Sequence, residues 1–400
     1  MSVARVLPAF SYGSVADPEL ARARILVVDD SEALRKTISI YLRHGGYRDI
    51  HEAASGEEAM SAADALSPDL IITDLLMPGM DGLELCRRLR ASSRHANVPV
   101  LIQTARANGD NRGEVFSNGA TDLISKPINA REMLGRVRVH LEQRALVQKL
   151  TKYQSMMAED LELARRMQES ILPNQTDIAS VEAAFPVEIA STYRASLGLG
   201  GDLWGISVPG ENQIGIYLAD FTGHGVAAAL NTFRFHSILR DQHFDELPLA
   251  EAMSSMNDFL ADTLPTGQFA TMLAFRIDFE ENSIEFSSAS GPPPMLRFGP
   301  DGDFEPIVLA GFPFGIMRDA SFATRKFPFP PGSAALFYSD ALIETPAPPY
   351  SIYTPENLGK TLSTAQEDTA EALRDCVLQG IADYELEDDL TLIAIRRKEG

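Results

Sequence analysis

The sequence predicts a doubly wound α/β domain, a long helical connector and an α+β domain, in that order along the chain. In the N-terminal part, continuous apolar runs alternate with helical segments, as in parallel sheets that are covered on both faces. The segment from about residue 130 to residue 172 has no glycine after Gly135 and no proline, which favours one long helix. From residue 176 onward, short strands and helices occur in separate runs, which is typical of a β-sandwich flanked by helices.

Length and charge restrict the classes of protein to consider. The chain has 400 residues with a net charge of −21, so it is long enough for two or three domains. Because nucleic acids and anionic membranes are negatively charged, we expect neither as a partner. The only cysteines, Cys86 and Cys376, are far apart, and the sequence has no membrane-span-like run and no signal peptide. We therefore expect a cytoplasmic protein.

The predicted parallel sheet carries polar residues at one edge. Residues 1–22 lack periodicity and predict a flexible tail. The apolar runs that follow are ILVVDD (25–30), DLIITD (69–74), VPVLIQTA (98–105) and DLISKP (122–127), and Ser31 is a candidate helix cap after the first. In such sheets the functional site lies at the carboxyl ends of the strands. The residues at that edge are Asp29, Asp30, Asp74, Thr104 and Lys126.

The connector keeps apolar residues at a spacing of three and four. These positions are Leu146, Leu150, Tyr153, Met157, Ala164, Met167 and Ile171, with a break at Asp160. A sustained heptad pattern indicates a coiled coil over residues 141–175 and hence a homodimer. The alternative is a helix that packs on its own domain.

Four acidic motifs distinguish the C-terminal part. They are GGD (200–202), DFTGHG (220–225), YSD (338–340) and DDLT (388–391). Most adjoin a strand-like apolar run, so one sheet edge can hold their carboxylates together although they are far apart in sequence. Converging carboxylates repel each other unless a cation neutralises them, and oxygen ligands suit Mg²⁺ or Mn²⁺. A site with two such cations is a recurring solution for hydrolysing phosphate esters. The runs 269–278 and 283–290 flank an acidic turn and predict a hairpin.

Residues 23–140 resemble a response-regulator receiver domain through the constellation at the sheet edge. The resemblance implies a five-stranded parallel sheet and a cognate sensor histidine kinase. It implies that Asp74 accepts the phosphoryl group and that Asp29 and Asp30 bind Mg²⁺ with Asp74 and the carbonyl of Leu76. A carboxylate that attacks phosphorus needs such a cation to screen both negative charges.

Two further residues would contact the phosphoryl group in this resemblance. Lys126 would supply a positive charge and Thr104 a hydroxyl donor. MPGMDG (77–82) also fits the turn that follows the phospho-acceptor in this family. Leu123 is a departure, because the family usually has an aromatic residue three positions before the lysine.

Residues from about 165 to 397 are similar to metal-dependent protein phosphatases of the type 2C (PPM) group, in the bacterial branch that acts on regulators of alternative sigma factors. We place the phosphatase domain at residues 176–400. The resemblance implies two Mg²⁺ or Mn²⁺ ions bridged by Asp220, with help from the carbonyl of Phe221. Asp340 and Asp388 would complete one ion, and Asp202 would bind or orient water at the other.

The roles of two further residues stay open. His224 is either a general acid near the leaving oxygen or a histidine that organises the loop after Asp220. Arg194 either meets the substrate phosphate or is a solvated arginine. Two departures from the family bear on catalysis. Ala341 replaces a usual glycine, which matters if the backbone there has positive φ, and Pro292 replaces a usual histidine.

The domain order predicts a response regulator whose phosphorylation at Asp74 controls a serine/threonine phosphatase. The resemblance implies that the substrate is a phosphorylated STAS-type anti-anti-sigma protein, and hence that the output is a stress response through an alternative sigma factor. The alternative is a catalytically silent phosphatase-like domain that acts as a phosphorylation-dependent protein-binding switch.

Overall fold

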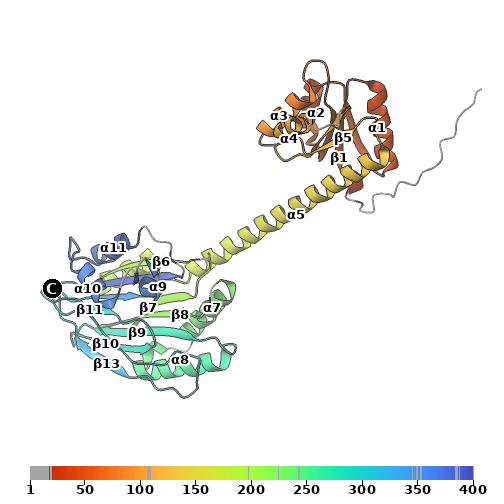
Figure 1. The fold of residues 1–400 in the computed structure, drawn as a ribbon. Coiled ribbons are helices and arrows are strands. Elements are labelled where there is room, and N and C mark those ends of the chain that lie inside the picture. The colour runs from red at the N-terminus through yellow and green to blue at the C-terminus, as the bar shows by residue number, and fades with distance from the viewer. Residues whose placement is uncertain are drawn as a thin grey trace, which may run out of the picture. The chain divides into compact units, whose positions relative to one another are not determined.

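The computed structural model divides the chain into two compact units, Met1–Met156 and Met157–Gly400 (Figure 1). The residues that it describes are 18, 20–105, 110–196, 198–223, 225–241, 244–344, 346–347, 350–351, 354–382, 386 and 388–399. None of the described helices is long and apolar enough to span a bilayer.

The first unit contains a parallel five-stranded sheet with strand order β2-β1-β3-β4-β5. Its strands are β1 (Arg24–Val28), β2 (Asp49–Ala53), β3 (Leu70–Asp74), β4 (Val100–Thr104) and β5 (Asp122–Ser125). Its helices are η1 (Leu20–Arg22), α1 (Glu32–His44), α2 (Gly56–Leu66), α3 (Gly82–Ala91), α4 (Asp110–Ser117) and the start of α5 (Ala130–Glu169). The predicted α/β fold is confirmed. Strand β2 lacks an apolar run because it lies at the edge of the sheet, where only its last residue is buried.

Alternate residues of the strands fill two cores, one on each face of the sheet. Leu26 of β1 packs with α2 and α3, whereas its neighbour Ile25 packs with α1 and the start of α5. Leu20 is also buried in the second core, so the predicted tail contains a residue that packs on this unit. Ser31 occupies the N-cap of α1 but makes no capping hydrogen bond with its side chain. Its N–H instead donates to Asp29 Oδ1 (2.9 Å).

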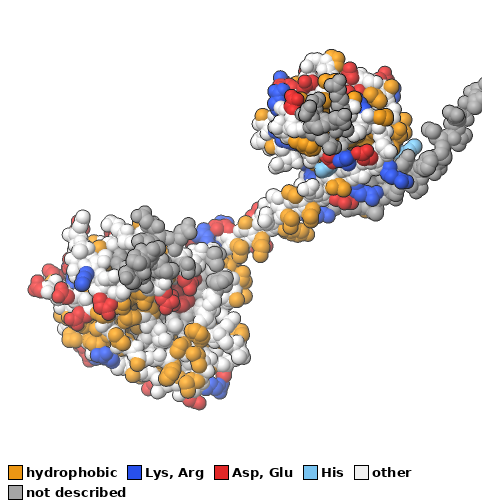
Figure 2. Space-filling model, in the orientation of Figure 1, with side chains coloured by type: hydrophobic (Ala, Val, Ile, Leu, Met, Phe, Trp, Pro, Cys, Tyr) orange, Lys and Arg blue, Asp and Glu red, His pale blue; other side chains and the backbone are white. Residues whose placement is uncertain are grey.

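Helix α5 is one continuous helix, as predicted, although it ends at Glu169 and a second helix, α6 (Gln175–Ala184), follows it. Five apolar residues of the predicted heptad pattern are each more than half exposed, and apolar side chains are visible along α5 in Figure 2. They are Leu146, Leu150, Tyr153, Met157 and Met167. Pairing of this face between two copies of the chain stays a prediction.

The second unit contains two antiparallel five-stranded sheets, with orders β13-β10-β9-β8-β7 and β12-β11-β14-β17-β6. The strands of the first sheet are β7 (Asp202–Gly210), β8 (Gln213–Phe221), β9 (Ala270–Asp278), β10 (Ser283–Ala289) and β13 (Thr324–Pro328). Those of the second are β6 (Val187–Arg194), β11 (Met295–Arg297), β12 (Glu305–Pro306), β14 (Ala334–Tyr338) and β17 (Leu390–Arg397). The predicted hairpin is the β9–β10 pair, whose turn contains Asn282 at a φ of 53°.

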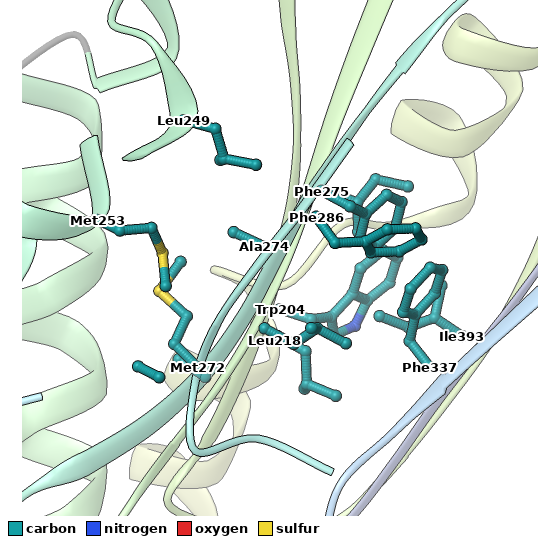
Figure 3. Packing of buried hydrophobic residues seen from close by; sticks show 14 of the residues in the cluster. Trp204, Leu218, Leu249, Met253, Met272, Ala274, Phe275, Phe286, Phe337 and Ile393 are labelled. Carbon is teal, nitrogen blue, oxygen red and sulfur yellow. The ribbon is translucent and has the colours of Figure 1, made fainter. Parts of the chain in front are cut away.

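Helices cover the outer faces of this sandwich, and the predicted α+β fold is confirmed. They are α7 (Val226–Asp241), η2 (Phe244–Glu246), α8 (Leu249–Thr263), α9 (Ala341–Glu344), α10 (Pro355–Leu362) and α11 (Ala370–Gly380), and a small two-stranded sheet joins β15 (Pro346–Ala347) to β16 (Tyr350–Ser351). Between the sheets, Phe275 of β9 stacks on Phe337 of β14, with ring centroids 3.8 Å apart. On the other face of β9, Met272 packs with Met253 of α8 (Figure 3).

Candidate functional site

The predicted site of the first unit is assembled at the carboxyl edge of its parallel sheet. Asp29 and Asp30 follow β1, Asp74 ends β3 and Thr104 ends β4. One carboxylate oxygen from each of the three aspartates lies within 4.8 Å of the other two. Lys126 Nζ lies 2.8 Å from Asp74 Oδ2. The structure thus brings together the five residues that the sequence placed at this edge.

The donor set of this acidic cluster fits a divalent cation. Asp29 is fully buried, and its Oδ2 has no hydrogen-bond partner, although Lys126 Nζ lies 3.7 Å away. Burial is the largest cause that raises the pKa of Asp29, with Asp74 and Asp30 adding repulsion. A cation would satisfy the orphaned oxygen and remove that repulsion. Leu76, whose carbonyl is the further predicted ligand, exposes most of its side chain.

Leu123 is buried in the core between the sheet and α2 and α3. The position that is usually aromatic in receiver domains is therefore held by a packed aliphatic side chain. A ring that moves between a buried and an exposed position is not available at this residue.

The second acidic site draws its residues from both sheets of the sandwich. Asp202 begins β7 and Asp220 lies in β8, and the two residues are register partners. Asp340 follows β14, and Asp388 precedes β17 in the other sheet. The end of the sandwich thus gathers side chains that are up to 186 residues apart in sequence (Asp202 to Asp388).

The carboxyl groups of this site lie near enough to one another to affect their pKa values. Burial raises the pKa of Asp220 to about 7, and the negative charges of Asp340, Asp388, Asp389 and Glu344 contribute to the shift. Burial raises the pKa of Asp340 to about 6, with contributions from Glu344 and Asp388. Acidic side chains that are buried and that also repel one another are stabilised in their ionised form by a nearby positive charge.

The acidic side chains of the second site are less tightly clustered than those around Asp74. Among the residues that the structure describes, no other acidic trio is as tight as the one around Asp74. A wider spacing is compatible with two cations, because ions about 3.5–4 Å apart need ligands spread over both.

The two aspartates of the DDLT motif have different environments. Asp388 is exposed, whereas Asp389 is buried and accepts hydrogen bonds from the N–H groups of Gly201 (2.6 Å) and Ser196 (2.8 Å). Asp389 therefore fixes the GGD loop and leaves Asp388 as the candidate metal ligand. Thr391 of the same motif donates its hydroxyl to Asp202 Oδ2 (2.6 Å).

The GGD motif requires glycine at its first two positions because neighbouring atoms lie too close to leave room for a Cβ atom. A Cβ on Gly200 would lie 2.4 Å from Asp389 Oδ2, and one on Gly201 would lie 2.4 Å from the carbonyl oxygen of Phe221. That carbonyl, the predicted backbone ligand, therefore lies against the GGD loop, and the Phe221 ring is buried in the core. Any larger residue at either position would displace the loop.

Gln168 is a site residue that the sequence analysis missed. It lies in α5, is almost fully buried, and binds both polar groups of Gly200. Its Nε2 donates to the Gly200 carbonyl (2.7 Å) and its Oε1 accepts the Gly200 N–H (3.1 Å). A signal was present, because Gln168 stands four residues after Ala164 and three before Ile171, on the apolar face. Glu344, which acts on both Asp220 and Asp340, was missed as well.

The remaining predicted residues have varied positions. Ala341 begins helix α9 and does not have positive φ, so its replacement of glycine causes no backbone strain. Arg194 is exposed at the end of β6, beside Leu390. Pro292 is partly buried in the segment after β10. His224 lies outside the described residues.

Comparison with known proteins gives matches for both units. Residues 25–138 match the family model "Response regulator receiver domain", and residues 210–398 match "Stage II sporulation protein E (SpoIIE)". The chain is 37% identical over 134 residues to the DNA-binding dual master transcriptional regulator RpaA of Synechocystis sp., which is 34% of this chain and 55% of that protein. It is 40% identical over 120 residues to the DNA-binding response regulator MtrA of Mycobacterium tuberculosis, or 30% and 51% of the two chains. The chain thus spans about half the length of these relatives.

A solved structure resembles the second unit. The SiaA-PP2C domain of Pseudomonas aeruginosa superposes with a TM-score of 0.53 at 16% identity, over 61% of this chain and 98% of that domain. The fold and the family matches together define a receiver domain followed by a phosphatase-type domain. The chain contains a response-regulator receiver domain at residues 25–138 and a SpoIIE-type domain of the protein phosphatase 2C kind at residues 210–398.

Proposed function

We propose that this protein is a two-component response regulator whose output is a metal-dependent serine/threonine protein phosphatase. The observation that carries the proposal is the convergence of partly or fully buried acidic side chains from both sheets. Burial, together with repulsion from the neighbouring acidic groups, raises the pKa of Asp220 to about 7 and that of Asp340 to about 6. Such a cluster is costly in a protein without cations and is suited to a site that holds them. The match to the SpoIIE family supports a phosphatase as the type of enzyme.

The proposed ligands divide over two Mg²⁺ or Mn²⁺ ions. Asp220 would contribute to holding both ions, Asp340 and Asp388 would hold one of them, and the Phe221 carbonyl would assist. Asp202 binds or positions water at the other, with its Oδ2 oriented by the Thr391 hydroxyl. When bound, two such ions neutralise phosphate charge and lower the pKa of water. Because water attacks the phosphate ester directly in this proposal, no covalent intermediate with a protein side chain is required.

The receiver supplies the regulatory input. In our proposal a sensor histidine kinase phosphorylates Asp74, beside a Mg²⁺ ion held by Asp29, Asp30, Asp74 and the Leu76 carbonyl, with Lys126 and Thr104 on the phosphoryl group. Helix α5 begins in the receiver unit and carries Gln168, which binds Gly200 two residues before Asp202. A change in α5, or in its pairing within a homodimer, therefore has a direct route to the catalytic loop.

The proposed substrate is a phosphoserine or phosphothreonine on a small STAS-type anti-anti-sigma protein. Its dephosphorylation would control an alternative sigma factor. The SpoIIE family match and the resemblance to sigma-factor-regulating phosphatases support this partner.

An assay with matched controls tests the enzyme. We expect Mn²⁺-dependent hydrolysis of p-nitrophenyl phosphate and of a phosphorylated STAS protein, and no activity in Asp220→Asn. The assay is run with and without a phosphoryl-group mimic on Asp74. Wild-type activity equal to that of Asp220→Asn in both states would exclude the enzyme and leave the phosphorylation-dependent binding switch. The ordinary helical backbone at Ala341 removes one of the two observations that favoured that alternative.

A further inference from the structure

 The receiver unit contains a cavity of about 910 Å³ at the end of its parallel sheet that lies opposite Asp74. One wall is α5, from His140 to Ser155, and the opposite wall is the segment before β4 together with the segment that precedes β5. Because Pro99 precedes β4 and Thr121 precedes β5, the cavity lies at the amino edge of the parallel sheet, away from the phosphorylation site.

The lining of this cavity is cationic in a chain whose net charge is −21. The described residues that line it include Arg90, Arg144 and Lys152, and none of them is acidic. Arg90 donates to the carbonyl oxygens of Gly119 and Val98, each at 2.8 Å. These acceptors are neutral, so they leave the charge of its guanidinium uncompensated.

Arg144 has an unfilled hydrogen-bonding position in the same wall. Its Nη1 donates to the carbonyl of Asn97 (2.8 Å), but its Nε is buried without a hydrogen-bond acceptor. The nearest carboxylate oxygen, Asp69 Oδ1, is 3.7 Å from Nε, which is too long for a hydrogen bond. A buried donor without an acceptor destabilises the fold, and an anionic ligand that accepts from it would relieve that cost.

We propose that this cavity binds a small phosphate-bearing molecule of nucleotide size. Arginine and lysine side chains bind phosphate through charge-assisted hydrogen bonds. Asn97 and Gln148 offer amide groups to a polar ring, and the volume lies within the usual range for small-molecule sites. Because α5 forms one wall, a bound ligand holds this helix against the sheet and gives the protein a second input beside Asp74. This inference goes beyond the proposed phosphatase function and does not depend on it.

Calorimetric titration of the full-length protein with ATP tests the site. The titration is done in EDTA, because without cations the two acidic sites repel phosphate. We expect one ATP per chain, competition by tripolyphosphate and no binding of adenosine. Lys152→Glu should weaken the affinity by about tenfold or more, since it replaces an attractive charge by a repulsive one. Thr151→Trp, which places an indole in the cavity from an exposed helix position, should abolish binding.

A matched control separates the cavity from general charge effects. Lys360→Glu makes the same charge change at an exposed position of α10 and should leave ATP binding unaltered. The proposal is overturned if ATP does not bind, if adenosine binds as well as ATP, or if Lys152→Glu and Lys360→Glu have equal effects. If ATP does not bind and Lys152→Glu changes the sedimentation coefficient, the cavity is instead a contact between copies of the chain.

Discussion

Replacement of Gln168 by leucine tests how α5 supports the GGD loop at residues 200–202. Gln168 is 1% exposed and makes three hydrogen bonds through its amide. Two join it to the N–H and C=O of Gly200, and the third joins its Nε2 to Thr232 Oγ1 (3.2 Å). Leucine has a similar size but cannot make any of the three.

The expected loss of stability follows from the groups that are left without partners. A buried polar group that loses its partner costs about 1–3 kcal/mol, so the two backbone groups of Gly200 together give about 2–6 kcal/mol. Movement of the loop relieves part of this cost, although the hydrogen bond from Gly201 to Asp389 restrains it. We therefore expect a fall of about 2–4 kcal/mol in the free energy of unfolding, and displacement of the neighbouring Asp202.

The chain offers a specific probe for this measurement. Trp204 is the only tryptophan and is buried in the core of the second unit, so its fluorescence reports the unfolding of that unit alone. Phosphatase activity is measured in parallel as a function of Mn²⁺ concentration. We expect Gln168→Leu to raise the Mn²⁺ midpoint by about tenfold, which corresponds to about 1.4 kcal/mol. Gln154→Leu, at an exposed position of the same helix, is the matched control.

Two results would refute this reasoning. An unchanged Trp204 transition would mean that the amide contributes nothing to the packing of the loop. A lower stability with an unchanged Mn²⁺ midpoint would mean that Gln168 supports the fold without positioning Asp202.

The other predictions concern the acidic sites and the connector. In EDTA, the free energy of unfolding of the second unit should fall as the pH rises from 4 to 7, because the folded state binds the Asp220 proton more tightly than the unfolded state does. The difference between the ordinary pKa of 3.8 and about 7 corresponds to about 4 kcal/mol. Asp220→Asn should flatten this profile, and a profile that rises with pH would contradict the assignment. Asp389→Ala should lower the melting temperature because the N–H groups of Gly201 and Ser196 lose their acceptor. Asp388→Ala should mainly weaken Mn²⁺ binding. Equal effects of the two changes would argue against separate roles for these aspartates. Asp74→Asn should remove the response to a phosphoryl donor while basal phosphatase activity persists, and a retained response would place the phospho-acceptor elsewhere. Leu150→Glu should shift the sedimenting species from dimer to monomer, and a wild-type monomer at micromolar concentration would show that the exposed face of α5 does not pair.

Much of the receiver site was accessible from the sequence. Asp29, Asp30 and Asp74 end or follow apolar strands, and parallel strands place their carboxyl ends at a common edge whatever the details of packing. The long helix could be predicted because its segment has no proline and no glycine after Gly135. Strand β2 has no such local signal, because an edge strand buries little and therefore needs no apolar run.

The roles of the residues in the second acidic site could be assigned only from the tertiary structure. The sequence identified the four acidic motifs, but Asp388 and Asp389 are neighbours of the same type and their roles were not distinguishable. Only the fold decided that Asp389 is buried against Gly201, 188 residues away, while Asp388 stays exposed. The role of Gln168 could not be predicted from the sequence for the same reason. Its function lies in the loop that it binds, and the choice of a hydrogen-bond partner across the core is a property of packing, which local sequence patterns do not encode.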